Sequence, residues 1–165
     1  MKNLIQYTLV LLAVGLIVLW QTGFNPFATK EVGEVVSPST FKEMKKKTDS
    51  DGKRIALSGT FSVSNSNLTV NLGQPTSLGF SDEKGDHIDF FKIWNGDGKN
   101  EFSLPGTFKP EDLKIYDNEG KVHGYNEKVK ISFTLNRIEE AEPEKNPNTG
   151  EYVWEWDDLR IDPVK

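Results

Sequence analysis

A long apolar run at the amino terminus constrains this chain more than any other feature. From Leu4 to Trp20, 14 of 17 residues are apolar and none is charged. As a helix, the run would be about 25 Å long at roughly 1.5 Å per residue, slightly less than a bilayer core of about 30 Å. A segment that is apolar on every face suits lipid better than the core of a small domain. We therefore predict a transmembrane signal anchor over residues 4–22.

The flanks of this run predict its orientation. Trp20, Phe24 and Phe27 lie where the helix would leave the hydrocarbon, at the interface where aromatic side chains are enriched. Lys2 is the only charge on the other side, so residues 1–3 should stay in the cytoplasm. The prediction is a single-pass protein of the cell inner membrane, with its carboxy-terminal domain periplasmic or extracellular.

Two other interpretations of the run stay open. A cleaved signal peptide would need a small-x-small peptidase site, and none follows Trp20 promptly. A buried core helix is the other alternative. It would require a core large enough to surround the helix on every face.

The rest of the chain divides into a linker and one domain. Gly23, Pro26 and Gly33 are breakers that predict a linker over residues 23–36, followed by an exported β-domain over residues 37–165. A total of 165 residues leaves room for one domain of ordinary size. The absence of cysteine excludes a disulfide scaffold, cysteine-based zinc sites and thiol catalysis.

The domain is predicted to be all-β with one short helix. Ser37 caps a helix that carries apolar Phe41 and Met44 and ends near Lys47. Beyond it the apolar period changes to two, and Gly59 marks a bend in the first strand. Strands are predicted at residues 55–63, 68–72, 78–81, 88–94, 113–116, 129–138 and 152–161.

The strand layout supports a resemblance to a known architecture. Residues 51–61 and 124–135 each begin at a turn and continue into an alternating strand, and a closing strand ends at residues 159–164. With the helix before the first strand, this layout resembles the small OB-type barrels of exported bacterial proteins. The resemblance covers roughly residues 41–164 and implies a membrane-anchored small β-barrel. An antiparallel β-sandwich remains the alternative.

One family of this plan, the periplasmic haem chaperone of cytochrome c maturation, also has a single anchor and an OB barrel. That family attaches haem through a histidine close before a tyrosine, near the end of the barrel. Here His123, Gly124 and Tyr125 have a different spacing and precede the strand at 129–138. The resemblance therefore does not carry haem attachment to His123.

Sequence motifs do not predict an enzyme. The chain has no nucleophile elbow, phosphate loop, zincin helix or dinucleotide fingerprint. Residues 21–165 carry 19 basic and 25 acidic groups, whereas a nucleic-acid groove needs a cationic surface with aromatic platforms. We expect a protein without enzymatic activity that does not bind nucleic acid.

We expect no bound cofactor, and calcium in an acidic loop is the alternative that the sequence leaves open. Calcium prefers six to eight oxygen ligands. Acidic loops rich in Asn, Asp and Gly could supply such ligands. Tight turns need the same residue types, so turn formation also explains these loops without a metal. A second candidate metal site has only two ligands, His87 and Asp89, which lie on one face of a strand. The first calcium candidates are Asn95, Asp97, Asn100 and Glu101.

Apolar residues on both faces of the strand at 88–94 point to a binding function. Such a strand is either buried on both sides or has an exposed face that a partner covers. The candidate interface residues are Phe90, Phe91 and Trp94, with the small residues Gly15 and Ala13 as contacts within the anchor. We expect an accessory subunit of a bacterial envelope complex that binds another protein. The alternative is an exported module that binds a small ligand or a metal.

Overall fold

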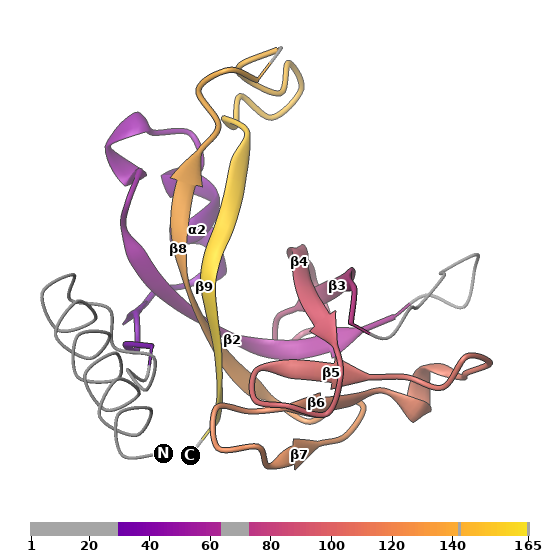
Figure 1. The fold of residues 1–165 in the computed structure, drawn as a ribbon. Coiled ribbons are helices and arrows are strands. Elements are labelled where there is room, and N and C mark those ends of the chain that lie inside the picture. The colour runs from indigo at the N-terminus through magenta and orange to yellow at the C-terminus, as the bar shows by residue number, and fades with distance from the viewer. Residues whose placement is uncertain (1–29, 64–72, 142, 165) are drawn as a thin grey trace, which may run out of the picture.

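The structure is a computed structural model that describes residues 30–63, 73–141 and 143–164. It confirms an all-β domain with one short α-helix (Figure 1). The α-helix is α2 (Pro38–Met44), and short 3-10 turns span Thr48–Ser50 and Pro110–Asp112. The strands are β1 (Glu34–Val35), β2 (Arg54–Ser62), β3 (Pro75–Ser81), β4 (His87–Asn95), β5 (Glu101–Ser103), β6 (Lys114–Tyr116), β7 (Val122–His123), β8 (Val129–Arg137) and β9 (Trp154–Pro163).

Helix α2 begins where the sequence predicts. The Ser37 hydroxyl accepts a hydrogen bond from the Thr40 amide at 3.1 Å, and Pro38 occupies the first turn, where its missing N–H costs nothing. The helix ends at Met44, earlier than predicted. The next carbonyl, that of Lys45, accepts bonds from the Tyr152 amide and the Trp154 indole. Contacts with the far end of the chain therefore take the place of another helical turn.

The strands form one sheet in the order β7-β6-β5-β4-β3-β2-β8-β9, and β1 lies parallel to β2. The predicted hairpin is confirmed as β3 and β4, although β3 begins at Pro75, which the sequence had predicted to be a break. The strands β5 and β7 were missed, because each is too short for its side chains to show an alternation. The predicted strand at residues 68–72 lies outside the described residues.

The bend predicted at Gly59 is where β2 changes partner. Residues Arg54–Gly59 pair with β8, and Thr60–Ser62 pair with β3. A Cβ atom at Gly59 would lie 2.1 Å from the Ser81 carbonyl oxygen and 2.9 Å from the Phe80 ring. Only glycine lets β3 cross so close to β2, and this crossing folds the sheet over its own core.

The folded sheet encloses an aromatic core. The largest side chains in it are almost completely inaccessible to solvent, and α2 contributes one of them. The rings pack edge-on or tilted, as aromatic pairs prefer. The fully buried phenylalanines are Phe41, Phe80, Phe91, Phe102 and Phe133.

Residues 30–36, the described part of the predicted linker, are bound to the domain. β1 pairs with Ile55 and Ala56, and a Cβ atom at Gly33 would lie 2.2 Å from the Ile55 carbonyl oxygen. Gly33 therefore permits close backbone contact and does not act as a flexible breaker. Among residues 30–63, 73–141 and 143–164, no helix is long and apolar enough to cross a membrane. The predicted anchor at residues 4–22 lies outside these ranges.

Candidate binding face

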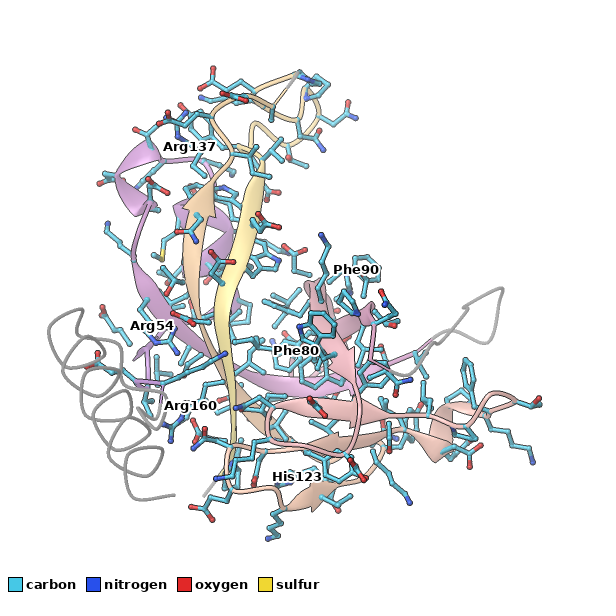
Figure 2. All side chains as sticks on the ribbon, in the orientation of Figure 1. Arg54, Phe80, Phe90, His123, Arg137 and Arg160 are labelled. Atoms are coloured by element: carbon cyan, nitrogen blue, oxygen red, sulfur yellow. The ribbon has the colours of Figure 1, made fainter. Side chains whose placement is uncertain are left out.

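The predicted interface residues on β4 separate into two groups. Phe90 is 59% exposed and Trp94 is 54% exposed, whereas Phe91 is completely buried against Phe80, Phe133 and Trp156. From Phe90 to Asn95 the strand alternates between exposed and buried side chains. Phe90 and Trp94 therefore lie on the outer face of β4, and Phe91 belongs to the core. Figure 2 shows Phe90 at this outer face and Phe80 in the core.

Small residues on β3 leave these rings uncovered. Gly79 pairs with Phe90, and Pro75 pairs with Trp94. A Cβ atom at Gly79 would lie 3.8 Å from the Phe90 ring, so that ring lies over the glycine. Phe90 and Trp94 lie on one face of β4 with the exposed Lys92 between them, and large exposed aromatic side chains of this kind are typical of binding surfaces. We call Phe90 and Trp94 the β4 aromatic pair.

Two grooves lie between this part of β4 and strand β9. The larger has a volume of about 540 Å³ and is lined by Trp94 and Lys92 on β4 and by residues from Glu155 to Leu159 on β9. The smaller, of about 280 Å³, is lined by Phe90, Ile138 and Trp154 among others. Lys92, Glu155 and Trp156 line both, so the two grooves adjoin each other along one line, which we call the β4–β9 groove.

Side chains bridge β4 and β9 where the described backbone does not pair. The Trp156 indole N–H donates to the Phe90 carbonyl at 3.1 Å, and Lys92 Nζ lies 4.0 Å from a Glu155 carboxylate oxygen. β9 pairs only with β8, and β4 pairs with β3 and, at Trp94 and Asn95, with β5. The sheet therefore leaves a seam between β4 and β9, which side chains hold together.

A buried lysine, Lys45, joins the first part of β4 to the segment just before β9. Lys45 Nζ lies 2.8 Å from an Asp89 oxygen of β4 and 3.1 Å from a Glu151 oxygen just before β9. It also lies over the Phe41 ring, 5.1 Å from its centroid. The sequence predicted only a helix that ends near Lys47, not a buried ion pair at Lys45. Of the predicted pair His87 and Asp89, Asp89 therefore takes part in this ion pair, whereas His87 is exposed.

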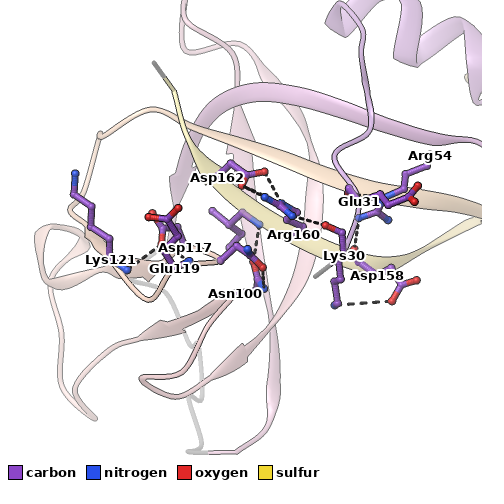
Figure 3. A network of polar contacts seen from close by, with 12 residues as sticks. Lys30, Glu31, Arg54, Asn100, Asp117, Glu119, Lys121, Asp158, Arg160 and Asp162 are labelled. Atoms are coloured by element: carbon purple, nitrogen blue, oxygen red, sulfur yellow. Dashed lines mark hydrogen bonds and ion pairs between the residues drawn. The ribbon is translucent and has the colours of Figure 1, made fainter. Parts of the chain in front are cut away.

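A second set of contacts ties the start of the described chain to β9 (Figure 3). Lys30 Nζ donates to the Leu159 carbonyl at 3.1 Å, and the Lys30 carbonyl accepts from Arg160. Arg54 donates to the Glu31 carbonyl at 2.8 Å and to the Asp158 carbonyl at 3.0 Å. These contacts therefore hold Lys30, the first described residue, beside the β4–β9 groove that it helps to line.

The predicted calcium ligands have structural partners. The Glu101 carboxylate accepts from the Gly98 amide at 2.7 Å, and the Asn100 side chain accepts from the Ile161 amide at 2.7 Å. Asn95 is buried and Asp97 is exposed. In the part of the chain that the structure describes, no three His, Cys, Asp or Glu side chains are grouped to hold a metal ion. Calcium binding stays a prediction. The Glu101 contact belongs to the turn, and the Asn100 contact joins this loop to β9.

A buried charge cluster around Asp117 was not predicted from the sequence. This carboxylate accepts from His123 Nε2 at 2.9 Å and from the amides of Glu119 and Lys121 at 2.8 and 2.9 Å. Burial raises the pKa of Asp117, but the bonds from His123 and from the amides together lower it below its usual value. The other ring nitrogen of His123 lies 3.4 Å from a Glu127 oxygen. These contacts hold a turn together and assign no chemistry to His123.

The remaining predicted site residues cannot be placed. Gly15 and Ala13, the predicted contacts within the anchor, lie outside the described residues, as do Trp20, Phe24 and Phe27 of the predicted membrane interface. Comparisons with protein-family models, with curated proteins and with solved structures find no match for this chain. The candidate site therefore rests on the geometry of β4 and β9.

Proposed function

We propose that this protein is a single-pass membrane protein of the bacterial envelope whose exported β-domain binds a protein partner, without enzymatic activity of its own. The observation that carries the proposal is the β4 aromatic pair, two large rings that are more than half exposed beside a groove. Aromatic side chains of this kind supply most of the binding energy in many protein interfaces.

The strand order supports the OB-type interpretation of the domain. The strands β4, β3, β2, β8 and β9 are consecutive in the sheet, and β9 approaches β4 again through the Trp156 to Phe90 bond. A partly open barrel of five strands is the plan of the OB fold, and the face of its second and third strands is a common binding surface. Here those strands are β3 and β4, on which Phe90 and Trp94 lie.

Tethering gives this binding its proposed mechanism. An anchor at residues 4–22 would confine the domain to the membrane plane and so raise its effective concentration beside a membrane partner. Its partners would then be a membrane protein complex and, through the anchor, the lipid bilayer. An accessory subunit of this kind needs a rigid attachment, and the contacts of Lys30, Arg54 and Arg160 support one.

The experiment is purification of the full-length protein in mild detergent, with mass spectrometry of the proteins that elute with it. We expect a membrane protein to co-elute with the wild type and its recovery to fall at least tenfold in the Phe90→Ala, Trp94→Ala double variant. Val35→Ala is the matched control, because Val35 is 64% exposed on β1, away from the β4 aromatic pair. A wild-type protein that elutes alone would refute the proposal.

A further inference from the structure

We infer that Trp94 and Glu101 together bind an arginine side chain of the protein partner. In this arrangement the Trp94 ring stacks on the guanidinium group, and the Glu101 carboxylate accepts hydrogen bonds from it. The inference rests on the proposed function, since it needs a protein partner at the β4 aromatic pair. It goes further by naming the chemical group that the partner presents there and the carboxylate that selects this group.

The first support is that Trp94 and Glu101 lie side by side on one face of the sheet. Their Cα atoms are partners in the parallel pairing of β4 with β5, so the two side chains project to the same face. The next pair along, Asn95 and Phe102, points to the other face, and both of its residues are buried. Trp94 and Glu101 also line the larger part of the β4–β9 groove, whose volume of about 540 Å³ is typical of ligand sites. An aromatic face and a carboxylate therefore border the same space.

The carboxylate of Glu101 is held in place by the backbone. Its Oε2 atom accepts a hydrogen bond from the Gly98 amide at 2.7 Å. A carboxylate that is already oriented loses little conformational freedom when it accepts a further bond, and a bond from a guanidinium to a carboxylate is among the stronger kinds. Glu101 is therefore prepared to receive a cationic donor beside Trp94.

The charges around Trp94 favour a cation over an anion. Four carboxylates and three lysines line this part of the groove, and two of the lysines pair with carboxylates of the lining at 4.0 Å. An anionic headgroup or a phosphate would therefore meet more negative than positive groups, whereas a basic side chain has the complementary charge. The charged residues of the lining are Lys30, Lys92, Lys99, Glu101, Glu155, Asp157 and Asp158.

Another ring of the same domain shows how such groups combine. Lys145 Nζ lies 4.1 Å from the centroid of the Tyr152 ring, and Arg137 Cζ lies 5.4 Å from it. The Arg137 guanidinium also binds the carboxylates of Glu139 and Glu144 at 2.8 and 2.9 Å. The Tyr152 site thus joins an aromatic face, a guanidinium and a carboxylate.

Trp94 and Glu101 supply two of these three groups, the aromatic face and the carboxylate. Within the described part of the chain, lysine or arginine side chains lie over the rings of Phe41 and Tyr152 and over no other ring. The Trp94 ring, which is 54% exposed, is therefore open to a cation of the partner, and tryptophan attracts cations more strongly than the other aromatic residues do. Arginine suits this place better than lysine, because its planar guanidinium can stack on the ring and donate to the carboxylate at the same time.

The first test titrates the full-length protein in detergent micelles with N-acetyl-arginine amide and follows the indole N–H signals by NMR. The Trp94 signal is the one that disappears in Trp94→Phe. We expect a saturable shift of this signal, and we expect N-acetyl-citrulline amide, a neutral group of the same shape, to bind at least about tenfold more weakly. Equal binding of the two probes, or no shift with the arginine probe, would overturn the inference.

A pair of variants tests whether Glu101 selects the cation. Glu101→Gln removes the negative charge and keeps an oxygen for the Gly98 amide, so we expect the arginine probe to bind about tenfold more weakly. The matched control is Asp97→Asn, which removes an exposed carboxylate of the same turn that does not line the groove, and it should change binding by less than about twofold. Equal binding to the two variants would show that Glu101 is not the ligand.

The partner itself tests whether the ring acts as an aromatic face or only as an apolar surface. Trp94→Phe and Trp94→Leu both keep an apolar side chain, but only phenylalanine offers a face that attracts cations. We expect recovery of the co-eluting partner to be at least about threefold higher with Trp94→Phe than with Trp94→Leu. Equal recovery would overturn the stacking arrangement.

The two proposals can fail separately. If the partner co-elutes and its recovery depends on Phe90 and Trp94, but the arginine and citrulline probes bind alike, the inference is wrong and the proposed function stands. If the wild type elutes alone, the proposed function is wrong, and the inference about its partner is wrong with it.

Discussion

The aromatic residues of β4 and those of β9 look alike in sequence and behave differently in the structure. On β9, the Trp154 indole donates to the Lys45 carbonyl at 2.9 Å, and the Trp156 indole donates to the Phe90 carbonyl. On β4, Phe90 and Trp94 remain more than half exposed. Tryptophan on β9 therefore joins separate parts of the fold, while the β4 aromatic pair is free to bind. The difference lies in what each ring contacts, which residue type alone does not reveal.

The comparison is tested most strongly by truncating one tryptophan on each strand. Trp156→Ala removes a ring that packs against Phe41, Phe91 and Phe133, together with its bond to β4, so we expect a loss of about 3–5 kcal/mol in the free energy of unfolding. Trp94→Ala should cost less than about 1 kcal/mol, because most of that ring is already in water. Urea denaturation of both variants measures the difference. Similar losses would show that the two strands use their tryptophans in the same way.

A second prediction concerns the lysine that joins β4 to β9. Lys45→Met keeps the aliphatic stem but leaves Asp89 and Glu151 beside each other without a cation, and we expect about 2 kcal/mol of destabilisation. This figure is below that for a fully buried pair, because both carboxylates keep some solvent contact. Lys46→Met is the control, since Lys46 is exposed and its change should lie within about 0.5 kcal/mol. Equal stability of the two variants would mean that Lys45 contributes nothing to the seam.

A third prediction concerns Asp117, which lies outside β4 and β9 in a turn that its buried carboxylate holds together. Its effect on stability can be compared with the effects of the residues on those strands. Its pKa is lower in the folded state than in the unfolded chain, so its contribution to stability is complete above the unfolded pKa and is lost as the pH falls through the folded pKa. Asp117→Asn should cost about 1–2 kcal/mol at pH 7 and flatten the loss of stability below about pH 4. Asp97→Asn is the control, because Asp97 is exposed, and it should change the free energy of unfolding at pH 7 by less than about 0.5 kcal/mol. An unchanged profile for Asp117→Asn would refute this account of the turn.

Sequence patterns predicted the long elements well. The alternation in β2 and β8, the cap at Ser37 and the hairpin of β3 and β4 are local signals, and each appears where it was expected. The short strands β5 and β7 depend on neighbours brought close by the fold, so their residues carry no local pattern. Gly59 could be interpreted from sequence as a bend, but its crossing partner Ser81 could not.

The candidate site was only partly predictable. Sequence singled out Phe90, Phe91 and Trp94 together, and the register of β4 then assigned Phe91 to the core. The Lys45 ion pairs join residues that are far apart in the chain. The Asp117 cluster lies in a turn that carries no known motif. No rule based on residue spacing could therefore find either of them. The β4–β9 groove depends on which edges the sheet leaves unpaired, and that follows only from strand order.

The central claim is that the β4 aromatic pair serves binding and the β9 tryptophans serve folding. The most direct measurement determines the melting temperature and the recovery of the co-eluting partner on the same preparations of full-length wild type, Trp94→Ala and Trp156→Ala. We predict that Trp94→Ala loses the partner at an almost unchanged melting temperature, while Trp156→Ala lowers the melting temperature by several degrees. A Trp94→Ala protein that keeps its partner, or that melts as early as Trp156→Ala, would contradict the claim.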